Sequence, residues 1–278
     1  MNTVSSLTIA ADRFEPVAKH HRRAFTQGLE VVDLCGRDWL LETSGAPHST
    51  SRSSLIVYSL DVEKTAKQQI RPVSEIEIPG IFLEGVAQVD DSLLLITWKD
   101  QLLVHMKMSC SADQTPQFEV TNTFGLPYEG WGLAFDTRRK ELYMTTGGSD
   151  LIVLELPPQW DSMTPEQTPT VLGEKRRTTI TQNAAPLKSV NELEYLHAQD
   201  LLIGNVFGST DWVVISPTSG VVQRVVHFEH DHFFRERPRD PANDVMNGIA
   251  FWGREETFLF TGKRWDSIFG VSKDLILQ

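Results

Sequence analysis

The chain has 278 residues, of which 40% are hydrophobic, and a formal net charge of −11. This length and apolar content support one large folded domain or two small ones and exclude extensive disorder. The acidic balance opposes binding to nucleic acid or to an anionic membrane surface. Because the strongest apolar runs, 92–98 and 151–156, fall far short of the roughly 20 residues of a membrane helix, a soluble protein is expected.

The first 24 residues are predicted to be an N-terminal extension, either a closing strand or partly disordered. They lack the basic and continuous apolar regions of a secretory signal. The chain is therefore expected in the cytoplasm, or in a secreted or periplasmic location if the sequence shown is already processed. Two cysteines, Cys35 and Cys110, permit at most one internal disulfide.

Short apolar stretches bounded by Gly, Pro, Asp or Ser recur along the whole chain, and amphipathic helical segments are nearly absent. In chain order, strands are predicted at 93–98, 140–146, 151–156, 200–207, 212–216 and 256–262. Each is rich in β-branched, aromatic or Leu residues and too short for a typical helix. The sequence therefore predicts an all-β protein.

An internal repeat organises these strands. Its phrase is a small or acidic turn, an apolar strand, a polar turn and a second apolar strand that ends in Thr or Asn. Equivalent positions in the five copies are Gly28, Gly85, Gly132, Leu193 and Gly248, at spacings of 57, 47, 61 and 55 residues. A unit of this length fits a four-stranded antiparallel blade, and about 4–8 blades close a propeller. We predict one five-bladed β-propeller over residues 25–278, without a second domain and without need of a partner subunit, so a monomer.

The repeat also predicts where a pocket would lie, because a closed propeller brings equivalent strand ends to one central channel. Four of the five copies keep the glycine, but the residue before it changes each time, which is typical of a constant scaffold with variable binding groups. Aromatic, amide, acidic and basic residues gather at these positions and at the nearby strand ends: Gln27, Glu84, Trp98, Lys99, Trp131, Asn191, Glu192, Glu194, Asn247, Lys263 and Trp265. Such a mixture suits an apolar pocket with a few convergent polar groups.

Other features are interpreted as surface structure. Residues 157–189 are predicted to form a long excursion between strands of the third or fourth blade, and residues 227–240 a surface loop between blades. The histidines of that loop, His227, His230 and His232, have a spacing that could hold a metal, but solvated histidines are the preferred interpretation. The pair His20 and His21 is interpreted in the same way.

The repeated phrases resemble the plant-type and bacterial glutaminyl cyclases, or glutamine cyclotransferases, a family of five-bladed β-propellers. Nine phrases match in order: AFTQGLE (24–30), LETSG (41–45), FLEG (82–85), LITWK (95–99), EGWGLAFD (129–136), LYMTTGGSD (142–150), NELEYL (191–196), NGIAF (247–251) and TGKRW (261–265). One departure is Phe207, which stands where the family usually has a tryptophan.

The resemblance implies cyclisation of an N-terminal glutamine of a peptide or protein to pyroglutamate, with release of ammonia and without metal or other cofactor. It implies Glu84 as the catalytic carboxyl. It implies that the substrate is bound by Gln27, Trp98, Trp131, Asn191, Lys263 and the residue at the altered position, Phe207. The residue types suit the reaction, since one carboxyl with a raised pKa can take a proton from the ammonium and deliver it to the departing amide nitrogen.

Two other functions stay open at this point. In the first, a propeller lactonase or phosphotriesterase would hold a calcium-like ion through Glu84, Asn191, Asn247 and Glu194. In the second, the propeller binds peptide ends without catalysis. The argument for it is Phe207, which replaces a tryptophan that the family usually has.

Overall fold

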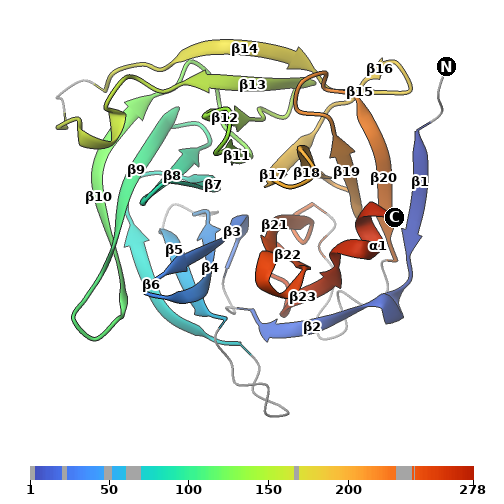
Figure 1. The fold of residues 1–278 in the computed structure, drawn as a ribbon, viewed down its shortest axis with the longest axis horizontal. Coiled ribbons are helices and arrows are strands. Elements are labelled where there is room, and N and C mark those ends of the chain that lie inside the picture. The colour runs from blue at the N-terminus through green and yellow to red at the C-terminus, as the bar shows by residue number, and fades with distance from the viewer. Residues whose placement is uncertain are drawn as a thin grey trace.

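The computed structural model describes residues 4–20, 24–46, 52–60, 70–165, 169–229, 240 and 242–278. Five antiparallel sheets of four strands stand around a central axis like the blades of a propeller (Figure 1). The predicted all-β, five-bladed architecture is therefore confirmed. The α-helix within the described residues, α1 (Lys273–Leu277), has five residues, and no helix there is long and apolar enough to cross a membrane.

The blades follow one another along the chain. Blade 1 contains β3 (Thr26–Leu34), β4 (Arg37–Ser44), β5 (Ser53–Ser59) and β6 (Pro72–Ile78), and blade 2 contains β7 (Leu83–Val89), β8 (Ser92–Thr97), β9 (Leu102–Cys110) and β10 (Pro116–Gly125). Blade 3 contains β11 (Leu133–Asp136), β12 (Glu141–Met144), β13 (Asp150–Glu155) and β14 (Gly173–Thr179). Blade 4 contains β17 (Val190–Leu196), β18 (Leu201–Val206), β19 (Asp211–Ile215) and β20 (Val222–Phe228). Blade 5 contains β21 (Met246–Trp252), β22 (Thr257–Gly262) and β23 (Ser267–Ser272).

The N-terminal segment completes the ring. Strand β1 (Ser5–Ile9) runs parallel to β20 at the edge of blade 4, and β2 (Phe14–Lys19) pairs antiparallel with β23 as the fourth strand of blade 5. One short segment thus joins the last two blades and covers two sheet edges (Figure 1). A 3-10 turn, η1 (Ala11–Arg13), connects the two strands.

Hydrophobic clusters fill the spaces between neighbouring blades. The described residues form five such clusters, and each draws mainly on two adjacent blades, including one between blades 5 and 1. Side chains alternate along each strand, so the apolar residues of both faces of a blade enter the clusters on either side. The closed ring therefore has a continuous core around its axis.

The inner strands are bulged at the repeat phrase. Strand pairing shifts by an extra residue between Thr26 and Gly28, and comparable shifts occur at the starts of β7, β17 and β21. A bulge bends the strand and turns a side chain out of the ordinary alternation. The variable residue of the repeat is thereby directed away from the sheet at four of the five blades.

The glycines of the repeat allow these bulges to crowd around the axis. A Cβ atom on Gly85 would lie 2.7 Å from the backbone nitrogen of Leu133, and one on Gly132 would lie 2.0 Å from the carbonyl oxygen of Asn191. In three blades the Thr or Asn near the end of the second strand bridges to the next blade: the Thr43 hydroxyl donates to the Glu84 carbonyl oxygen at 2.5 Å, and Thr145 and Asn205 donate likewise to the carbonyl oxygens of Asn191 and Met246. The repeat phrase therefore makes the polar contacts between these blades near the axis.

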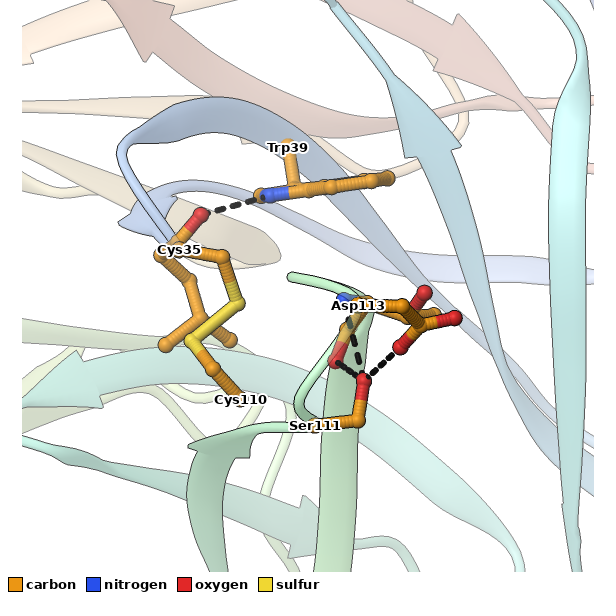
Figure 2. Close-up of a disulfide and its surroundings, with 7 residues drawn as sticks. Cys35, Trp39, Cys110, Ser111 and Asp113 are labelled. Carbon is orange, nitrogen blue, oxygen red and sulfur yellow. Dashed lines mark hydrogen bonds between the residues drawn. A yellow bond between two sulfur atoms is a disulfide. The ribbon is translucent and has the colours of Figure 1, made fainter.

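The two cysteines form a disulfide that joins blade 1 to blade 2. Cys35 lies in the turn between β3 and β4, and Cys110 ends β9, with the Cα atoms 5.7 Å apart (Figure 2). Beside it, the Trp39 indole donates to the Leu34 carbonyl oxygen at 2.8 Å. The bridge closes a loop over a sequence separation of 75 residues.

Three predicted surface regions differ from expectation in detail. Within 157–189, the charged cluster GEKRR (173–177) belongs to β14, the outer strand of blade 3, and a small hairpin of β15 (Thr181–Gln182) and β16 (Ala185–Pro186) follows. His227 lies in β20, one residue before the strand ends, and contacts Asp211 at 2.6 Å, whereas His230 and His232 lie outside the described residues. The interpretation of His20 as a solvated residue is wrong, because it is 5% exposed and bonded on both ring nitrogens.

Candidate active site

A pocket of about 380 Å³ opens where the inner strands begin. The bulge at the start of β7 directs Glu84 into it, and Asn191 enters from the equivalent place in blade 4. Lys263 arrives from the turn that follows β22. Three polar groups of different chemistry therefore converge on one cavity from blades 2, 4 and 5.

Aromatic rings form most of the remaining wall. Phe82 packs edge-on against Trp98 at 5.5 Å between ring centroids, and Phe25 packs against Phe82 at 6.3 Å. On the other side, Trp131 meets Phe207 at 5.7 Å. These contacts fix the rings against one another, so the pocket is preformed.

Glu84 is 6% exposed, and burial raises its pKa to about 8, while the positive charge of Lys263 acts in the opposite direction. Burial also lowers the pKa of Lys263, and here Glu84 acts against the shift. The Lys263 ammonium lies 4.8 Å from the Phe25 ring centre and 5.3 Å from that of Phe207. An apolar ring environment thus holds a carboxyl that titrates near neutral pH beside an amine.

Two buried amides support the pocket from behind. The Gln27 side-chain oxygen accepts a hydrogen bond from the Asn247 amide at 3.1 Å, and neither residue lines the cavity. Among the described residues, the Gln27 amide nitrogen and the Asn191 side-chain oxygen are buried and have no hydrogen-bond partner. Because an unpaired buried polar atom is costly, a ligand that donates a hydrogen to this oxygen of Asn191, a residue of the pocket wall, would be stabilised.

Most of the predicted site residues therefore meet in one place. Six of them line the pocket: Glu84, Trp98, Trp131, Asn191, Phe207 and Lys263. Gln27 lies behind the wall. Trp265, a candidate from the repeat pattern, is 2% exposed and packs beneath Gly262 with its indole donating to the Asp244 carbonyl oxygen at 2.9 Å.

Sequence reasoning missed three wall residues, Phe25, Ala242 and Asn243, whereas Phe82 was expected beside Glu84 as a residue that desolvates the carboxyl. Phe25 stands two positions before Gln27, as Phe82 does before Glu84, so the repeat itself carried a signal for it. Ala242 and Asn243 also line the pocket, but they come from the segment before β21, which lies outside the repeat phrase. No pattern in the sequence indicated that this segment would reach the site.

The four oxygen ligands proposed for a calcium-like ion do not gather. Glu194 lies further along β17 and lines a different cavity of about 510 Å³ together with Glu30. The side-chain nitrogen of Asn247 donates to Gln27, and although its oxygen has no hydrogen-bond partner among the described residues, Asn247 does not line the pocket with Glu84 and Asn191. Among the described residues, no group of three or more His, Cys, Asp or Glu side chains is arranged to hold a metal ion. The geometry therefore gives no support to the lactonase hypothesis.

Comparison with known proteins identifies the family of the chain. Residues 9–272 match the family described as glutamine cyclotransferase, which is nearly the whole chain. The chain belongs to the glutamine cyclotransferase family. A glutaminyl-peptide cyclotransferase of Arabidopsis thaliana is 25% identical over 252 residues, which cover 91% of this chain and 68% of the plant protein.

A solved structure shares the fold of this glutamine cyclotransferase family member. The crystal structure of Myxococcus xanthus glutaminyl cyclase superposes with a TM-score of 0.71 over 97% of each chain, at 24% sequence identity. This likeness supports the five-bladed ring as a whole. The resemblance inferred from the nine sequence phrases is confirmed by the family match.

Proposed function

We propose that the chain is a glutaminyl-peptide cyclotransferase that converts N-terminal glutamine to pyroglutamate and ammonia, with Glu84 as the proton carrier and without a metal. The observation that carries the proposal is the carboxyl of Glu84 in an aromatic pocket, the one carboxyl among the described lining residues, with its pKa raised to about 8 by burial. Family membership supports the reaction. The role of Glu84 rests on its place and environment.

The pocket suits the glutamine side chain. A compact carboxamide and its methylene groups would pack between the Trp98 and Trp131 walls, while the peptide leaves through the open mouth. The α-amine and the γ-carboxamide belong to the same residue, so the protein mainly holds a folded conformer in which nitrogen and carbon approach. Rigid rings that contact one another are suited to impose that conformer.

Proton transfer follows from the titration of Glu84. The ionised carboxylate takes one proton from the α-ammonium, which frees the amine to form the new C–N bond with the γ-carbon. The protonated carboxyl then gives that proton to the departing nitrogen as the C–N bond of the carboxamide breaks, and ammonia leaves. The ionised carboxylate takes the second proton of the former amine from the ring nitrogen, which leaves the neutral lactam of pyroglutamate, and releases this proton to solvent. One group performs both transfers because its pKa, about 8, lies close to that of an α-amine, about 7.7–8.0.

Developing negative charge on the carboxamide oxygen needs a positive or hydrogen-donating partner. Lys263 is the cation of the pocket, and it is 7% exposed, so its field is little screened by water. Asn191 offers its side-chain oxygen instead, which suits the α-amine or a peptide N–H. We assign Lys263 to the carboxamide oxygen and Asn191 to the nitrogen side of the substrate.

A comparison of substrates tests the proposal. The protein is incubated with a Gln-Xaa dipeptide, the matching Asn-Xaa dipeptide and an N-acetylated Gln-Xaa, and ammonia is measured with and without chelator. Ammonia should come from the free Gln-Xaa alone, at an unchanged rate in chelator. If Gln-Xaa releases no ammonia, the chain is not a cyclotransferase and the peptide-binding alternative is favoured. If the turnover is lost in chelator, metal independence is refuted.

A further inference from the structure

A buried histidine lies outside the pocket at the seam where the ring closes. His20 follows β2, and Glu42 lies on β4 of blade 1, so their contact joins the closing strand of blade 5 to blade 1. The His20 Nε2 lies 2.6 Å from a Glu42 carboxyl oxygen, and Nδ1 lies 2.7 Å from the Trp265 carbonyl oxygen. The side chains of His20 and Glu42 are both fully shielded from solvent.

The hydrogen bonds around His20 and Glu42 indicate that the two side chains form an ion pair. A carbonyl oxygen only accepts, so Nδ1 donates to Trp265. The Glu42 carboxyl accepts from the Thr26 hydroxyl on one oxygen and from the Tyr58 hydroxyl on the other, both at 2.6 Å. Burial alone would raise the pKa of Glu42, but His20 and these hydroxyls lower it on balance. Burial alone would lower the pKa of His20, which Glu42 raises on balance.

The ion pair fixes the turn that carries Lys263. This turn is closed by a hydrogen bond from the Trp265 N–H to the Gly262 carbonyl oxygen at 3.1 Å. His20 holds the Trp265 carbonyl at one end of the turn, and the Thr26 hydroxyl lies 3.3 Å from the Gly262 carbonyl at the other. The Trp265 end of the turn is therefore connected to the buried carboxylate of Glu42 through His20, whereas the Thr26 hydroxyl donates its one hydrogen to Glu42 and lies beside the Gly262 end.

We propose that His20 is a positioning residue for the reaction: anchored on Glu42, it holds the Trp265 carbonyl and so keeps Lys263 directed at Glu84. The catalytic meaning of this role rests on the proposed function. Within the described part of the chain, the side chain of His20 hydrogen-bonds Glu42, Thr26 and Trp265, none of which lines the pocket, so its effect passes through the turn. If the turn moves, the Lys263 charge moves away from Glu84, whose pKa then rises further because that charge is what lowers it.

Two substitutions distinguish the roles of the two ring nitrogens of His20. His20→Asn places an amide near the position of Nδ1 and can keep the bond to Trp265, whereas His20→Gln places it near Nε2 and keeps only the bond to Glu42. For His20→Gln we expect kcat/KM to fall by about 10- to 100-fold, since a shift of about 1 Å at a reacting group has that effect. We also expect the acid limb of its pH profile to move to higher pH. His20→Asn should keep the limb of the wild type.

The matched control is His105→Gln. His105 is also a buried histidine with both nitrogens bonded, to the Ser92 and Thr121 hydroxyls at 3.0 Å, but it lies in blade 2 and away from the turn. His105→Gln should lower the melting temperature and leave the acid limb in place. An unmoved limb in His20→Gln, or equal limbs in His20→Gln and His20→Asn, would overturn the proposal.

A second variant and a second readout keep the test decisive. If His20→Gln does not fold, Thr26→Val removes a hydrogen bond that orients Glu42 toward His20 and should move the limb in the same direction. If the wild type releases no ammonia, the proposed function fails. The titration of Glu84, followed by ¹³C NMR of glutamate-labelled protein and assigned with Glu84→Gln, then decides the positioning role: a higher pKa in His20→Gln supports it and an unchanged one refutes it.

Discussion

The titration of Glu84 should make kcat/KM fall as the pH decreases below about 8, which is the acid limb of the pH profile. The carboxyl must be ionised to accept a proton from the substrate ammonium, and burial raises its pKa to about 8. With that value, about one molecule in a hundred is competent at pH 6 and about one in eleven at pH 7. The ammonium form of the substrate falls only slightly over this interval, so kcat/KM should rise about eightfold between pH 6 and pH 7.

The two limbs of the profile can be assigned separately. The basic limb belongs to the substrate amine and should move when a Gln peptide of different amine pKa is used. The acid limb belongs to Glu84. It should move to higher pH in Lys263→Met, which removes the charge that lowers the pKa of Glu84, and less in Lys263→Arg, which keeps a charge.

The assay is the initial rate of ammonia release at low peptide concentration from pH 5 to pH 10, with folding checked at each pH by circular dichroism. A carboxyl of ordinary pKa, 4.5, would leave kcat/KM nearly flat between pH 6 and pH 7. That flat profile, or an identical acid limb in Lys263→Met, would refute the assignment of a buried, Lys263-coupled Glu84 as the base.

Three further predictions concern the frame and the wall of the pocket. Replacing Cys35 and Cys110 together by Ser should cost about 4 kcal/mol of unfolding free energy in the chain-entropy model, or about 10 °C in melting temperature by calorimetry, and an equally stable variant would contradict the bridge. Gly132→Ala should cost about 3 kcal/mol in a denaturant titration, because its Cβ would meet the next blade's carbonyl oxygen at 2.0 Å, whereas Gly148→Ala, with 3.5 Å of room, should change little; equal costs would refute the crowding. Trp131→Ala should lower kcat/KM about 30-fold through loss of about 2 kcal/mol of substrate packing, and unchanged kinetics would remove Trp131 from the wall.

Much of the site was predictable because the repeat records the geometry of the ring. The residue before each repeat glycine lies at a bulge, and symmetry brings the bulges to one place, so Glu84 and Asn191 could be grouped although they are far apart in sequence. The repeat pattern does not predict how far a side chain on an inner strand lies from the pocket. Glu194 therefore looked like a partner of Glu84, yet it lines a different cavity.

What could not be predicted depends on long-range contacts. His20 stands in a polar, basic stretch, and its burial comes from Glu42 and from Trp265, which is 245 residues away. Asn243 reaches the pocket from a segment that the repeat does not describe. The cluster 173–177 has too much charge to suggest a strand, but an outer strand exposes one face to solvent and tolerates it.

Ammonia and pyroglutamate formation by Glu84→Gln, beside Glu194→Gln, tests the proposed mechanism most directly. Both changes replace a carboxyl whose pKa is raised by desolvation with an amide of the same shape, but of the two only Glu84 lines the aromatic pocket. Measured by mass spectrometry on a Gln peptide, Glu84→Gln should fall about a thousandfold in rate with its melting profile intact, while Glu194→Gln keeps the wild-type rate. A Glu84→Gln variant that cyclises its substrate at the wild-type rate would contradict the central claim.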